Sequence, residues 1–96
     1  MSRIIVESQN ADNLKNLVKS AVENQLRAIN FGITKTKRKL AELEKENGMD
    51  SEMFYKEYQE GKLGDDMKYI RWAGEYETLG QLQKDYNELQ GTELCS

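Results

Sequence analysis

Apolar residues recur at steps of three, four and seven over the first half of the chain, from about Asn10 to Asn47. This spacing is typical of an amphipathic α-helix that buries one face. A helix over residues 10–47 would measure about 55 Å at 1.5 Å per residue, so it cannot cover its own apolar face. That face is formed by Leu14, Val18, Ala21 or Val22, Gln25 or Leu26, Ile29, Ile33, Leu40 and Leu43.

The segment before this helix has a different pattern. Residues 3–8, RIIVES, carry β-branched side chains without helical periodicity. This pattern favours a short β-strand or an extended arm, which we expect over residues 1–9.

A turn and a short helix are predicted to follow. Gly48 can end the long helix because glycine adopts the left-handed conformation at little cost. Asp50 is placed to cap a helix over residues 51–60, with Met49 and Phe54 in the positions of a hydrophobic staple. This short helix would form an elbow that closes over the end of a larger core.

A second long helix is predicted after the segment GKLGDD, residues 61–66. Its glycines end the short helix and permit a turn. Asp65 and Asp66 then supply an N-cap and a negative charge, which the helix dipole favours at this end. The helix is expected over residues 66–90 and to stop at Gly91, with residues 91–96 as a flexible tail.

One face of this second helix carries a heptad repeat, which is typical of coiled coils and helical bundles. At 96 residues the chain can build only a modest core, so self-association is expected, as a dimer or a higher even oligomer. Large aromatic side chains dominate the binding energy of many interfaces. The predicted protein interface consists of Trp72, Tyr76, Leu79, Leu82, Tyr86 and Leu89.

Two features of the helices have alternative interpretations. Glu75 falls on the heptad face, so either the helix turns Tyr76 inward and Glu75 outward, or a partly buried charge selects a basic partner. Interior glycines cost about 1 kcal/mol each relative to alanine. Either a close packing contact or a bend would explain them at Gly32, Gly74 and Gly80.

The predicted fold is therefore a single all-α domain of residues 1–96, with a long helix, an elbow helix and a second long helix. Charge favours antiparallel packing of the two long helices. Residues 1–47 have a net charge of +3, whereas residues 48–96 have a net charge of −6. This packing would form in the same chain or across a dimer.

Composition argues against an enzyme. The chain has no histidine, which removes the usual near-neutral base and the commonest transition-metal ligand. Its single cysteine, Cys95, cannot form an internal disulfide. Asp65 and Asp66 could hold Mg²⁺, but adjacent side chains diverge and capping is the simpler role. We expect no cofactor and no metal. No apolar run is long enough for a membrane helix, so the protein is expected to be cytoplasmic.

The strongest basic run is TKTKRK, residues 34–39. Lys35, Lys37, Arg38 and Lys39 are a candidate docking patch for an acidic protein or for nucleic acid. On a helix these side chains spread around more than half of the circumference, as solvated charges do. The pI near 5.0 also argues against nucleic-acid binding, which remains the alternative function.

The segment from Gly48 to Leu82 has a short helix with spaced aromatics, a G-x-L-G-D-D turn and a Trp-containing helix with a leucine heptad. It resembles small uncharacterised prokaryotic proteins that are considered antitoxin-like. The resemblance rests on Gly61, Leu63, Gly64, Asp65, Asp66 and Trp72.

The resemblance implies a small, acidic, helical protein that covers the active surface of a toxin-like partner. The chain differs from many antitoxins because its sequence contains no evident helix-turn-helix or ribbon-type DNA reader. The function predicted is a non-catalytic protein-interaction module that self-associates through its heptad faces and includes an antitoxin-like role.

Overall fold

The computed structural model describes residues 7–95, with side chains from residue 11 to residue 91. Its helices are joined by turns, and the described residues contain no strand, which confirms the predicted all-α class. Its helices are α2 (Glu7–Asn47), α3 (Ser51–Gln59) and α4 (Met67–Cys95). Within the described part, no helix combines the length and the apolar character that crossing a membrane requires.

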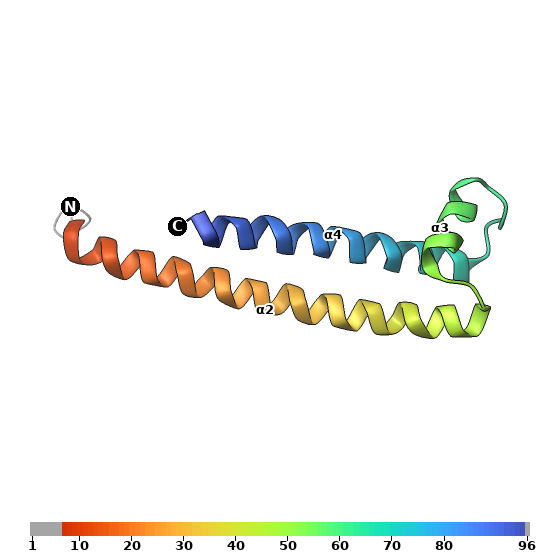
Figure 1. The fold of residues 1–96 in the computed structure, drawn as a ribbon, viewed down its shortest axis with the longest axis horizontal. Coiled ribbons are helices and arrows are strands. Elements are labelled where there is room, and N and C mark those ends of the chain that lie inside the picture. The colour runs from red at the N-terminus through yellow and green to blue at the C-terminus, as the bar shows by residue number, and fades with distance from the viewer. Residues whose placement is uncertain (1–6, 96) are drawn as a thin grey trace.

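The molecule is a helical hairpin in which α2 and α4 lie side by side and antiparallel (Figure 1). α3 crosses the end at which the chain turns. The extents are 63 × 21 × 21 Å. The longest is close to the roughly 61 Å that the 41 residues of α2 span at 1.5 Å per residue. α2 alone therefore sets the length of the molecule.

α2 begins before its predicted start. Glu7 and Ser8 are helical, whereas extended structure was predicted as far as residue 9. Once a helix has formed, each further residue adds a hydrogen bond at little cost, and glutamate and glutamine are good helix formers. The remainder of the predicted strand, residues 3–6, lies outside the described residues.

Gly48 ends α2 in the predicted left-handed conformation, with φ at +62°. The amides of Gly48 and Met49 both donate to the carbonyl oxygen of Glu44, at 2.8 and 3.3 Å. These bonds satisfy a carbonyl group that the end of the helix leaves without an intrahelical donor. Met49 then packs against the core at this end of the molecule.

α3 has the predicted cap at its start and a glycine stop at its end. The carboxylate of Asp50 accepts a hydrogen bond from the amide of Met53 at 2.8 Å. Beyond Gln59, Gly61 adopts a φ of +77°. The amides of Gly61 and Lys62 donate back into the last turn, both at 3.1 Å, which forms a Schellman motif.

α4 begins at a cap supplied by Asp66, whose carboxylate accepts a hydrogen bond from the amide of Lys68 at 3.0 Å. The helix continues to Cys95, so the predicted stop at Gly91 is wrong and residues 92–95 are helical. Gly91 does not have a positive φ. A glycine permits a helix to end but does not force it, and no proline follows.

The apolar faces of α2 and α4 pack against each other within one chain, which the sequence left open. An added Cβ on Gly32 would lie 3.3 Å from Leu82, and Lys39 lies 3.5 Å from Glu75. The two residue numbers add to 114 in both pairs, which defines the antiparallel register. The buried hydrophobic residues of this interface are Leu26, Ile29 and Leu40 of α2 and Trp72 and Ala73 of α4.

The core is concentrated where α3 covers the hairpin. We call Leu40, Phe54, Trp72 and Ala73 the elbow core. Phe54 and Trp72 are its least exposed members, at 0% and 1%. The half-buried residues packed around them are Leu43, Met49, Tyr55, Tyr58, Leu63, Tyr69, Tyr76 and Leu79. α3 therefore acts as the predicted elbow.

The interior glycines differ in their surroundings. Gly32 lies close to Leu82, so close packing explains its lack of a side chain. An added Cβ on Gly74 or Gly80 would meet nothing within 4 Å. Packing therefore does not explain these two glycines of α4.

Candidate interaction surfaces

The predicted interface residues of α4 are engaged, wholly or partly, inside a single chain. Trp72 is buried in the elbow core, and Tyr76 and Leu79 pack around it. Leu82 contacts Gly32 of α2, and Tyr86 is half-buried. Leu89 lines a shallow depression with Gln25, Ile29, Asp85 and Glu88. A role for these six residues between chains stays a prediction.

Trp72 is fixed by two contacts. Its ring stacks on Phe54 with centroids 3.9 Å apart and planes 3° from parallel. Its indole N–H donates to the hydroxyl of Ser51 at 2.9 Å. Ser51 is buried and stands at the first position of α3, so this bond joins α3 to α4. No sequence pattern predicts this role for Ser51, because its partner lies 21 residues away.

Glu44 connects α2 to the start of α3. Its carboxylate accepts a hydrogen bond from the amide of Ser51 at 2.8 Å, while its carbonyl oxygen accepts the bonds that end α2. A carboxylate at this position also faces the positive end of the α3 dipole. One residue therefore holds both sides of the turn, a role that the sequence pattern did not reveal.

Tyr55 joins α3 to α4 at the surface of the elbow. Its hydroxyl donates to the carboxylate of Glu77 at 2.6 Å. This hydrogen bond, followed by burial and then by the negative charge of Glu77, raises the pKa of Tyr55 above its ordinary value of 10.0. Tyr55 also packs against Tyr76, with ring centroids 4.9 Å apart.

Glu75 has a basic partner within its own chain. Its carboxylate lies 3.5 Å from the ammonium group of Lys39, and its side chain is 30% exposed. Tyr76 is also half-buried, and its ring packs against Tyr55 of α3. The structure therefore supports the interpretation that Glu75 pairs with a basic group, and that group is Lys39 of the same chain.

The basic run does not form one face. Thr36 is buried against α4, so its neighbours Lys35 and Lys37 lie on the two sides of α2. Lys35, Lys37 and Arg38 are exposed, and Lys39 is paired with Glu75. These four cations are therefore not directed at a common surface.

Asp65 and Asp66 are both exposed in the turn before α4. Asp66 caps the helix, and Asp65 precedes it. In the described part of the chain, no three or more histidine, cysteine or acidic residues are grouped as metal ligands would be. The geometry therefore assigns Asp66 the capping role.

Among the described residues, the N-terminal end of α2 extends past the end of α4. In the antiparallel register, Cys95 of α4 lies level with residue 19 of α2. Residues 7–18, which we call the α2 overhang, extend about 18 Å beyond it at 1.5 Å per residue. Figure 1 shows this end projecting past the C-terminus of the chain.

The overhang carries exposed apolar side chains. Leu14, Leu17 and Val18 are 60%, 58% and 55% exposed. Every residue from 11 to 21 is exposed, and half-buried residues begin only at Val22. The apolar pattern places Leu14 and Val18 on the face that α2 buries, so their exposure differs from that expectation. The predicted lengths of the two long helices differ, and this difference could have indicated that one end of α2 extends past α4.

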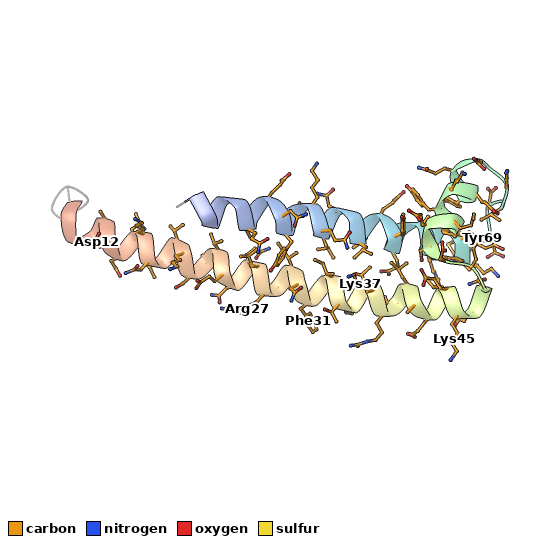
Figure 2. All side chains as sticks on the ribbon, in the orientation of Figure 1. Asp12, Arg27, Phe31, Lys37, Lys45 and Tyr69 are labelled. Carbon is orange, nitrogen blue, oxygen red and sulfur yellow. The ribbon has the colours of Figure 1, made fainter. Side chains whose placement is uncertain are left out.

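Other exposed apolar residues are more scattered. Phe31 is 71% exposed and lies on the side of α2 that faces away from α4 (Figure 2). Met67 and Ile70 lie one turn apart at the start of α4, and Met53 lies on α3. The overhang is the one place among the described residues where three such side chains fall within five consecutive positions.

Comparisons with known proteins add no relationship: no family model, no curated protein and no solved structure matches this chain. The antitoxin-like resemblance of residues 48–82 therefore stays a prediction.

Proposed function

We propose that this chain is a non-catalytic protein-interaction module whose binding surface is the α2 overhang. The observation that carries the proposal is the exposure of Leu14, Leu17 and Val18 on the part of α2 that extends past the end of α4. Amphipathic helices gain most of their stability by burying the apolar face. Contiguous exposed apolar patches commonly mark interaction sites.

The other end of the molecule supports this role. The elbow core and the caps at Gly48, Asp50 and Asp66 secure α2 to α3 and α4. The overhang is thus held by a packed hairpin, while its described side chains, from residue 11 onward, are exposed. A helical or grooved protein partner can therefore bury Leu14 and Val18 without disturbing the elbow.

An antitoxin-like role is one specific form of this proposal. In that version, the overhang would lie in a groove of a toxin-like protein. The alternative, nucleic-acid binding through Lys35, Lys37, Arg38 and Lys39, receives less support because Lys37 lies on the other side of α2 from Lys35 and Lys39 is paired with Glu75. Phosphate binding needs cations gathered along one surface.

Site-specific photo-crosslinking in the source cells tests the proposal. A photoreactive amino acid is placed at position 14, and at position 31 as the matched control, because both native side chains are exposed on α2. We expect a discrete protein adduct from position 14 at several times the yield from position 31. Equal yields, or no protein adduct from position 14, would sink the proposal.

A further inference from the structure

The charges of the α2 overhang and its continuation indicate which partner fits it. Asp12, Lys15 and Lys19 are the charged residues among positions 11–21, and all three are exposed. Their spacing of three and four places them along one side of the helix. That side borders the stripe of Leu14 and Val18. The opposite side carries no charge between residues 11 and 21.

We propose that the partner is a second copy of this chain, whose overhang packs antiparallel on the first about a two-fold axis between Asp12 and Asn13. This inference rests on the proposed function. In such a pair, each charged side faces the same side of the second copy in reverse order. Asp12 of each copy then comes within one turn of Lys15 of the other. A parallel pair would set the charged side against an uncharged one.

The apolar stripe supports the same arrangement. Leu14 and Val18 continue, at helical spacing, the face that α2 buries against α4 through Leu26 and Ile29. An antiparallel second overhang runs in the direction of α4 and lies beyond its end. The packing of α2 against α4 would therefore continue into the contact between the two overhangs. The dimer would be a longer rod with an elbow at each end.

The contact between the two overhangs is small. It overlaps about 12 residues of each copy, so its buried area falls below the roughly 1,200 Å² of standard stable interfaces. We expect a reversible dimer with a dissociation constant of about 10–1,000 μM.

Sedimentation equilibrium of the purified full chain tests the pairing. We expect Leu14→Asp to weaken dimerisation at least ten-fold, because it places a charge on the apolar stripe close to the two-fold axis. Phe31→Asp, the control on the opposite side of α2, should change it less than two-fold. Circular dichroism verifies that both variants keep the helicity of the wild type. A wild type that stays monomeric, or an unaffected Leu14→Asp variant, would overturn the inference.

Charge exchange tests the antiparallel direction. Asp12→Lys and Lys15→Glu should each weaken self-pairing several-fold, because like charges then face each other. Mixing the two variants should restore dimers to within about two-fold of the wild type, since position 12 of one variant then faces an opposite charge at position 15 of the other. Failure of the mixture to recover would contradict the antiparallel arrangement.

The two proposals fail differently. If the purified chain stays monomeric while position 14 still cross-links another protein in cells, the partner is a different protein and the interaction module stands. If position 14 cross-links nothing and the chain stays monomeric, both proposals fail.

Discussion

Phe54 and Trp72 join three helices through one pair of stacked rings. Phe54 comes from α3, Trp72 comes from α4, and both pack on Leu40 of α2. A well-placed aromatic pair contributes about 0.5–1.5 kcal/mol beyond the apolar area it buries. The hydrogen bond from the indole N–H of Trp72 to Ser51 removes the free-energy cost of burying an unpaired donor. The elbow therefore depends on a few side chains.

Truncating Trp72 should test that dependence. Trp72→Ala should lower the free energy of unfolding by about 3–5 kcal/mol, which is a large part of the total for a small domain. Phe31→Ala should change it by less than about 0.5 kcal/mol, because Phe31 is exposed. Urea denaturation followed by circular dichroism measures both. Similar losses in the two variants would show that the elbow core does not hold the fold.

Tyr55 should make stability depend on alkaline pH. Because its pKa is raised in the folded chain, its contribution is complete below the unfolded value near 10 and is lost as pH rises through the folded value. Wild type should therefore lose more stability than Tyr55→Phe between about pH 9 and pH 11. Urea denaturation across this range compares them. Parallel losses would show that the bond to Glu77 does not affect stability.

The ends of the helices are the features that the sequence predicted best. Gly48, Asp50, Gly61 and Asp66 act where they were expected, because caps depend on residues within about one turn. Gly91 failed because the same residue type also occurs inside helices. Contacts between distant residues, such as Ser51 with Trp72, leave no local pattern. Local patterns therefore predict the helices but not the hydrogen bonds that join them.

Two glycines should respond in opposite directions to alanine. Gly61→Ala should destabilise the fold by about 1 kcal/mol, because φ at +77° is strained for residues with a Cβ. Gly80→Ala should stabilise it by up to about 1 kcal/mol, since it is helical and an added Cβ meets nothing within 4 Å. Thermal unfolding compares the variants. A stabilising Gly61→Ala or a destabilising Gly80→Ala would contradict these assignments.

The whole molecule combines a packed end and an uncovered end. An apolar pattern shows that a helix face needs a partner, but it does not show whether that partner is in the same chain. α4 covers α2 over residues 22–47 and leaves the side chains of residues 11–21 exposed, because α2 has 41 residues and α4 has 29. Association is therefore expected at the tip of the rod rather than along its side.

Small-angle X-ray scattering over a concentration series tests this claim most directly. Dilute protein should scatter as one hairpin with a radius of gyration near 20.1 Å and a longest dimension near 63 Å. As concentration rises, the longest dimension should approach roughly 110 Å, twice the hairpin length less an overlap of about 18 Å. A dimer that thickens without lengthening would place the interface on the side of the hairpin and contradict the account.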